Sequence, residues 1–163
     1  MAADDVGRSL TRLSSETTVS GLLNAACEDL ATTLDATGCS VSRTVGDLLV
    51  ELGQFVRLRE PLPLALYLVS DYPLTREVLD QGEPRVVSRA DPKADPAEAE
   101  LLERLGFESL LMLPLRARQD TWGLVEVYRD GREFGSTEIA TAAAIVDGVG
   151  ELLAELENGV QKA

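Results

Sequence analysis

The sequence predicts an α+β domain with one central antiparallel sheet and with the first and last helices packed on the same face. Three observations lead to this prediction. Apolar residues follow a helical period at both ends of the chain, whereas the middle contains runs with the two-residue period of strands. Those runs come in two pairs joined by short polar turns, which is typical of antiparallel hairpins. The length of 163 residues suffices for one domain with a sizeable core.

The N-terminal part is predicted to form two helices. Apolar residues recur at spacings of three and four on both sides of the hydroxyl-rich segment 14–18, which suits a helix N-cap. We expect a leading helix or linker over residues 1–17 that leaves the domain. A core helix should then run from about Val19 to Ala36, with Gly38 closing it.

The middle of the chain is predicted to hold strands and short helices. Alternation over Cys39–Val45 and over Leu48–Val56 predicts a hairpin, and Leu64–Ser70 predicts a third strand or a buried extended segment. The segments that follow are predicted to be a helix over Leu74–Gln81, a strand over Arg85–Ser88 and a helix over Ala97–Leu105 that Asp95 caps.

The C-terminal part is predicted to add a hairpin and a long helix. The strands are Ser109–Ala117 and Trp122–Arg129, joined by the turn at 118–120. Ser136 or Thr137 should cap a last helix that runs to about Glu157. This order of elements completes the α+β prediction.

Composition excludes several classes of function. The chain has no histidine, which removes the usual catalytic triads, imidazole-bound zinc and histidine-bound haem. Its net charge of −13 opposes binding to nucleic acid or to an anionic membrane. Two cysteines are too few for a disulfide scaffold, and no apolar run is long enough to span a bilayer, so we expect a cytoplasmic protein.

Several segments in order resemble the GAF domain family. The stretch 108–115 followed by 122–127 is similar to the penultimate hairpin of GAF domains, and Phe134 before a capped helix matches their C-terminal helix. Gly82-Glu83-Pro84 and Leu105-Gly106-Phe107 are also GAF-like. We place the GAF-like domain at residues 18–158, with a dimerisation helix at 137–158 and a tail at 159–163.

The resemblance implies a sensory or regulatory module that takes part in signal transduction. GAF domains have terminal helices on one face of the sheet and short helices and loops that roof a small-molecule pocket on the other. We expect a non-catalytic domain with a small-molecule ligand, fused to or acting on a separate output domain. One alternative is a pure dimerisation or interaction module without a ligand. A second is an enzyme of the free methionine sulfoxide reductase type, which the lack of pocket cysteines disfavours.

Neither haem nor bilin is expected as a cofactor. Bilin attachment in the family needs a cysteine in the roof segments, usually beside a histidine. Cys27 falls on the apolar stripe of the first core helix and Cys39 opens the first strand, so both are interpreted as buried thiols. Cyclic-nucleotide binding of the phosphodiesterase type is also disfavoured, because its paired polar residues are not matched around Phe134. No metal site is expected.

Candidate ligand contacts come from one strand and from the roof. Alternation places Trp122, Leu124, Glu126 and Tyr128 on one face of their strand, and a carboxylate among apolar neighbours is costly without a partner. Glu126 and Tyr128 are therefore candidates for pocket residues. The alternative is that Glu126 pairs with an arginine such as Arg43, Arg76 or Arg89, or reaches solvent at a sheet opening. The further candidates are Tyr67, Tyr72, Arg76 and Arg89, each with the alternative of an ordinary turn, core or surface role.

The last helix predicts a homodimer. Its apolar residues follow a heptad pattern that continues past the expected end of the sheet, and the leading helix adds a stripe of its own. The predicted interface residues are Ile139, Ala142, Val146, Val149, Leu153, Leu156, Leu10 and Leu13.

Overall fold

The computed structural model describes residues 2–57, 60 and 65–162, and within them the chain forms six strands, five α-helices and one 3-10 turn. The strands are β1 Gly38–Val45, β2 Leu48–Val56, β3 Leu66–Leu68, β4 Arg85–Ser88, β5 Ser109–Ala117 and β6 Asp120–Arg129. The helices are α1 Ala2–Leu13, α2 Val19–Thr33, α3 Pro73–Gln81, α4 Pro96–Leu105 and α5 Ser136–Lys162, and the 3-10 turn η1 is Val69–Asp71. The predicted start of the third strand, at residue 64, lies outside the described residues.

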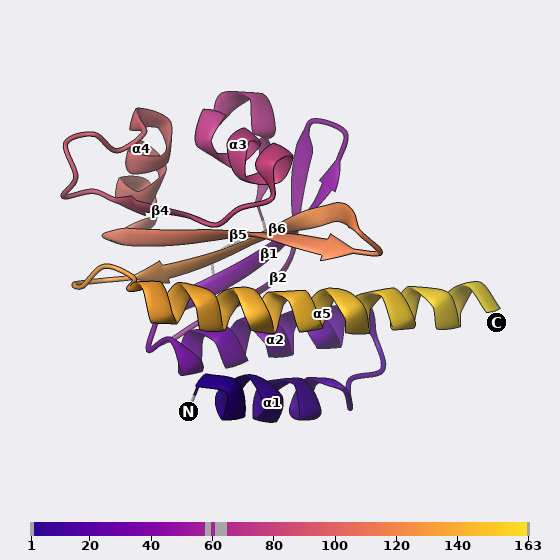
Figure 1. Cartoon of the computed structure of the whole chain (residues 1–163). Coiled ribbons are helices and arrows are strands. Elements are labelled where there is room, and N and C mark those ends of the chain that lie inside the picture. The colour runs from indigo at the N-terminus through magenta and orange to yellow at the C-terminus, as the bar shows by residue number, and fades with distance from the viewer. Residues whose placement is uncertain (1, 58–59, 61–64, 163) are drawn as a thin grey trace.

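The described strands form one antiparallel sheet in the order β3-β2-β1-β6-β5-β4. Helices α2 and α5 cover one face, which we call the helix face, and α1 lies outside them (Figure 1). Helices α3 and α4 lie over the opposite face, which we call the roof face (Figure 1). The predicted α+β architecture, with the terminal helices on the same side of an antiparallel sheet, is confirmed.

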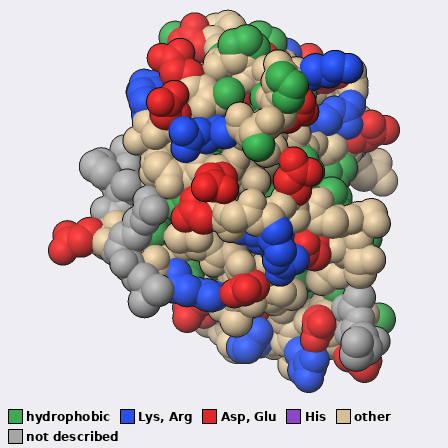
Figure 2. All heavy atoms as spheres, turned by 90° about the vertical axis from the view of Figure 1, so that its left-hand side faces the viewer, with side chains coloured by type: hydrophobic (Ala, Val, Ile, Leu, Met, Phe, Trp, Pro, Cys, Tyr) green, Lys and Arg blue, Asp and Glu red, His purple; other side chains and the backbone are tan. Residues whose placement is uncertain are grey.

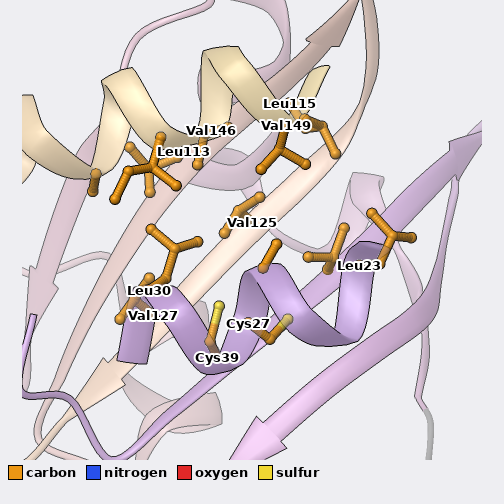
Figure 3. Close-up of a cluster of buried hydrophobic side chains, with 14 of the residues drawn as sticks. Leu23, Cys27, Leu30, Cys39, Leu113, Leu115, Val125, Val127, Val146 and Val149 are labelled. Atoms are coloured by element: carbon orange, nitrogen blue, oxygen red, sulfur yellow. The ribbon is translucent and has the colours of Figure 1, made fainter. Parts of the chain in front are cut away.

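Each face of the sheet has its own apolar core, because successive side chains of a strand point to opposite faces. The larger core lies between the helix face and α2 and α5 (Figure 3). It contains Val125 and Val127 of β6, together with Leu30 of α2. The smaller core lies under the roof and contains Leu124 and Tyr128 of the same strand. Strand β6 therefore contacts both layers of the domain.

Helix α1 packs on the domain, so the prediction that it leaves the domain is wrong. Leu13 is buried in the helix-face core, and Leu10 packs against that core. Arg12 forms an ion pair with Asp29 of α2, with 2.6 Å between nitrogen and oxygen. The apolar stripe of α1 is covered within the same chain.

Helix α2 ends earlier than predicted. Its C-cap is Leu34, and the following Asp35 has a φ of +49° in the left-handed region. Gly38 does not close the helix and instead opens β1. Asp35 takes the left-handed conformation that was expected of a glycine. Residues with short polar side chains tolerate this conformation better than most others do.

The heptad stripe of α5 is also covered within the chain. Ala142, Val146, Val149 and Leu153 are buried in the helix-face core, and Ile139 and Leu156 pack against it. At its C-terminal end the helix meets the β5–β6 hairpin, where Trp122 Nε1 donates to Glu157 Oε1 at 2.7 Å. The premise that no sheet remains to cover this stripe is wrong, because the hairpin reaches that far. The homodimer itself stays a prediction. No helix in the described part of the chain is long and apolar enough to cross a membrane.

Trp122 lies on the other face from the one predicted. Leu115 is paired with Gly123 and Arg116 with Thr121, so Trp122 is an extra residue with no partner on β5. Such a bulge interrupts the alternation of side chains. Trp122 consequently packs in the helix-face core, whereas Leu124 and Tyr128 keep the predicted roof side.

Candidate functional site

Glu126 and Tyr128 point to the roof face from the middle of β6. Glu126 lies at the alternate position between Leu124 and Tyr128, which both belong to the roof core, so its side chain points the same way. Only 6% of Glu126 and 8% of Tyr128 is exposed. In the sheet register Glu126 lies opposite Ser40 of β1 and Met112 of β5. A carboxyl group is thus fixed at the centre of the sheet, away from water.

Two other acidic residues lie near Glu126, and we call the three the roof carboxyls: Glu51, Glu98 and Glu126. Burial raises the pKa of Glu126 to about 8, and the charges of Glu98 and then Glu51 add to the increase. The hydroxyl of Tyr128 favours the charged form and acts in the opposite direction. Burial also raises the pKa values of Glu98 and Glu51. Three carboxyls from β2, α4 and β6 therefore share one poorly solvated region.

The arginines considered as partners of Glu126 are engaged elsewhere. The Arg43 guanidinium lies over the Trp122 ring, 5.0 Å from its centroid. Arg76 forms its ion pair with Asp47. Arg89 donates to the backbone oxygen of Phe107 at 3.4 Å. Because Glu126 is also almost fully buried, neither alternative for it, an arginine partner or exposure to solvent, holds among the described residues.

A small cavity lies beside Glu126 and Tyr128 on the roof face. Its volume is about 40 Å³. The polar part of the wall comes from β1, β2, β3 and β6, and Leu105 and Phe107 supply an apolar side. The Phe107 ring stacks on the ring of Tyr128 with 5.0 Å between centroids. The lining residues are Gly38, Cys39, Ser40, Glu51, Gln54, Val56, Ala65, Tyr67, Leu105, Phe107 and Tyr128.

The structure brings some of the predicted roof residues to this cavity and not others. Tyr67 lines it, and burial raises the pKa of its phenol to about 12. Tyr72 makes an edge-to-face contact with Tyr67 at 5.8 Å, so it supports the cavity wall from behind. Arg76 and Arg89 are exposed and do not line the cavity. The interpretation of these two as ordinary surface arginines is the one that fits.

Glu98, Glu51, Ser40 and Thr75 were missed by sequence reasoning. Glu98 is in the first turn of α4. An acidic residue there is usually solvated, and its negative charge interacts favourably with the helix dipole. Here it is fully buried and accepts a hydrogen bond from the hydroxyl of Thr75 in α3. Glu51 carried a readable signal, since it interrupts an apolar strand as Glu126 does. Its Oε2 accepts from the backbone nitrogen of Ala65 at 3.1 Å.

The sequence of this chain matches the model of a known protein family. The profile of the GAF domain matches residues 18–153, which is most of the chain. The chain belongs to the GAF domain family. The resemblance of the hairpin motifs is thereby confirmed. No curated protein matches this GAF domain.

Several solved structures of phytochromes have the same fold. The GAF domain superposes on the phycocyanobilin-bound GAF domain of a cyanobacterial phytochrome with a TM-score of 0.83 and 17% identity, covering 98% of this chain and 97% of the other. A bacteriophytochrome from R. palustris gives a TM-score of 0.83 and 13% identity, with 97% and 38% covered. The chromophore-binding domain of a Stigmatella aurantiaca phytochrome, in its wild-type form, gives 0.78 and 15%, with 91% and 58% covered. At these identities the likeness shows the fold alone.

The GAF domain spans between about two fifths and three fifths of the longer phytochrome chains that it matches. Its two thiols lie on the helix face of the sheet (Figure 3). Cys27 of α2 and Cys39 of β1 are both free and buried, and burial raises the pKa of the Cys39 thiol. The Cys39 thiol is therefore a poor nucleophile, because its reactive thiolate form is disfavoured.

Proposed function

We propose that this GAF domain is a non-catalytic regulatory module that binds a small molecule in the roof cavity and transmits occupancy to its terminal helices. The observation that carries the proposal is the small cavity beside Glu126 and Tyr128. Polar side chains from β1, β2, β3 and β6 converge on it in a region that is otherwise apolar. Such convergence of a few polar groups in an apolar pocket is typical of a ligand site.

The size of the cavity favours a ligand much smaller than a tetrapyrrole. Drug-sized ligands occupy pockets of roughly 300–1,000 Å³, whereas this cavity has about 40 Å³. Covalent attachment would also need a thiol directed at the cavity, and the side chains of Cys27 and Cys39 pack in the helix-face core. These two observations do not fit a covalently held bilin, although the fold is that of bilin-binding domains.

The sheet offers a direct route from the cavity to the helices. On β6, Glu126 and Tyr128 face the cavity side, and Val125 and Val127 face α2 and α5. Helix α5 packs tightly on β5, since a side chain at Gly150 would meet the Arg116 backbone oxygen at 1.9 Å. Movement of β6 that is passed to β5, its partner in the sheet, would therefore reach α5. A ligand drives such a shift only by binding one packing more tightly than the other.

Two alternatives have less support. Thiol-dependent reduction of a sulfoxide needs cysteines at the pocket, and the side chains of Cys27 and Cys39 lie on the other face of the sheet. A pure interaction module would not require buried carboxyls around a polar cavity. It would retain its fold and its partners when those carboxyls are replaced.

The partners remain proposals as well. We infer a homodimer that uses the outer side of α1 and α5, because the apolar stripe named above is already covered. Val6, Ala140 and Ala144 line a shallow groove on that side. An output domain, fused or separate, would receive the signal from these helices, and a cytoplasmic setting fits a chain with two free thiols.

Native mass spectrometry of the purified protein, followed by thermal denaturation with neutral, anionic and cationic metabolites, tests the proposed function. We expect a retained small molecule, or stabilisation by one class of compound, that is lost in the variant Ser40→Val at the cavity wall. The control is Ser70→Val, which changes the same residue type on the exposed turn η1. No retained molecule and no stabilisation by any class would contradict the proposal.

A further inference from the structure

We propose that the ligand of the roof cavity is a small organic cation with a primary ammonium group, held between Glu51 and the surrounding tyrosines with Glu98 and Glu126 behind them. The inference rests on the proposed function, because it names the class of ligand for that site. It is carried by three properties of the region: the sign of its charges, the hydrogen-bond acceptors left over, and the shape and chemistry of the cavity wall.

The roof carboxyls have no counter-charge among the described residues. None of the ion pairs in that part of the chain includes Glu51, Glu98 or Glu126. Elsewhere acidic side chains are interspersed with basic ones, as on the face shown in Figure 2. Burying one ionised carboxylate without a partner is costly, and burying three near one another costs more. A bound cation would remove that cost, whereas an anion would increase it.

One buried hydrogen-bond acceptor of the roof carboxyls also lacks a donor among the described residues. Glu98 is fully buried, and its Oε1 accepts from Thr75 while its Oε2 has no partner in the described part of the chain. Thr75 also contacts Met112, which is paired with Glu126 in the sheet. Glu98 therefore lies on the roof side of Glu126. Orphaned buried acceptors are uncommon in folded proteins. An ammonium group supplies three donors and no acceptor.

The cavity wall suits an organic cation. The rings of Tyr67, Phe107 and Tyr128 line it beside the carboxyl of Glu51 and the hydroxyl of Ser40. Aromatic faces attract cations, and carboxylate and hydroxyl oxygens accept their protons. The space of about 40 Å³ compares with roughly 10–15 Å³ for a single water, so it admits an ammonium group with a short alkyl stem.

A bare metal ion fits less well. Within the described residues, no three acidic or cysteine side chains converge closely enough to hold one. The roof carboxyls instead come from three separate elements, β2, α4 and β6, and of the three only Glu51 lines the cavity. An organic cation can span such an arrangement because its charge and its apolar stem contact different walls.

The groups facing Glu126 predict how binding depends on pH. They are Ser40 of β1, Glu51 of β2, Tyr67 of β3, Tyr128 of β6 and Glu98 of α4. The pKa of Glu126 is about 8, so part of the population must lose a proton before a cation is paired. A primary alkylammonium stays charged to about pH 10. Affinity should therefore rise between about pH 6.5 and 8.5, with release of a fraction of a proton.

The test is isothermal titration of the whole chain with ethylammonium chloride at pH 8.5 and constant ionic strength, using sodium chloride, ethanol and sodium acetate as comparison solutes. A probe of three heavy atoms should bind no tighter than about millimolar. We expect Glu51→Gln to weaken binding roughly tenfold or more, since a charge-assisted hydrogen bond is lost. The control Glu151→Gln removes the same charge from the exposed side of α5 and should change affinity less than about twofold.

Three results would overturn the inference. Equal responses to ethylammonium and sodium, or equal losses in Glu51→Gln and Glu151→Gln, would show only general attraction to an acidic protein. Binding of ethanol or acetate without ethylammonium would make the ligand class wrong and leave the proposed function standing. Arg59 lies outside the described residues, and strong binding that appears only in Arg59→Gln would show that the chain supplies its own cation.

Discussion

The hydroxyl of Thr75 in α3 donates a hydrogen bond to the carboxyl of Glu98 in α4, and this bond joins the two helices over the roof face. Both residues are buried, and the same hydroxyl contacts Met112 of β5 at 3.6 Å. The roof is therefore tied to the sheet beside Glu126. Its stability should depend on this one hydroxyl more than on any exposed contact of α3 or α4.

Replacing Thr75 by valine should destabilise the domain by about 1–3 kcal/mol, because the buried Glu98 carboxyl would lose its hydroxyl donor. Thr75→Ser retains the hydroxyl and should cost less, about 1 kcal/mol, from the lost methyl group. Urea unfolding of both variants measures the difference. Equal destabilisation by valine and serine would show that packing matters and the hydrogen bond does not.

Replacing Glu126 by glutamine should change how stability depends on pH. The pKa of Glu126 in the folded domain, about 8, lies above the value of 4.5 for an ordinary glutamate. The stability that the protonated group contributes is therefore complete below about pH 4.5 and is lost as pH rises toward 8. The stability of the wild type relative to Glu126→Gln should fall by at most about 1.4 kcal/mol per pH unit in this window.

Urea unfolding of both proteins at pH 5, 7 and 9 measures that difference. A parallel pH dependence for wild type and Glu126→Gln would contradict the burial of an isolated carboxyl. Glu133→Gln, an exposed change before α5, is the matched control and should follow the wild type.

Arg129 should be a major structural residue of the domain. It is buried at the end of β6 and donates to Glu138 Oε1 at 3.1 Å, to the Glu133 backbone oxygen at 3.3 Å and to the backbone oxygen of Leu34. This pairing lowers the pKa of Glu138. Replacing Arg129 by methionine removes the donor to the Leu34 and Glu133 backbone oxygens and the buried partner of Glu138, and it should cost about 3–5 kcal/mol.

Arg132 provides the matched control, because it reaches the same Glu138 carboxylate at 3.4 Å from an exposed position. Arg132→Met should cost less than about 1 kcal/mol. Thermal unfolding followed by circular dichroism compares the two variants. Similar losses would mean that burial of the guanidinium adds nothing to its contribution.

The covered stripe of α5 changes the expected outcome of mutations there. Leu153 is 0% exposed, so Leu153→Lys should leave the chain largely unfolded, since it buries a charge in the core. Ala144→Lys lies on the exposed outer side of α5 and should yield folded monomers in light scattering if the wild type is a dimer. A folded, monomeric Leu153→Lys variant would restore the original stripe as the interface.

The sequence was sufficient for the fold because periodicity reports which face of an element is buried. It could not say what buries that face. The stripe of α5 has the same pattern whether α2 and the hairpin cover it, as here, or a second chain does. Trp122 was placed on the wrong face because a bulge leaves no mark in the alternation.

The candidate site was predictable only in part, for a similar reason. Glu126 was found because a carboxylate in an apolar strand is anomalous wherever the strand packs. Glu98 was not, because its burial depends on how α4 settles over α3 and the sheet, which are distant in sequence. Tyr67 and Tyr128 meet around the cavity only after β1 pairs with both β2 and β6.

The most direct test of the roof cavity as the ligand site is amide hydrogen exchange, measured with and without ethylammonium at equal ionic strength. It shows which segments the cation protects. We expect ethylammonium to slow exchange in β2 Leu48–Val56, β3 Leu66–Leu68 and α4 Pro96–Leu105, which lie around the roof carboxyls. Sodium at the same concentration should not slow exchange in these segments. No difference between the two cations, or protection confined to the exposed side of α1 and α5, would contradict the assignment of the roof cavity as the ligand site.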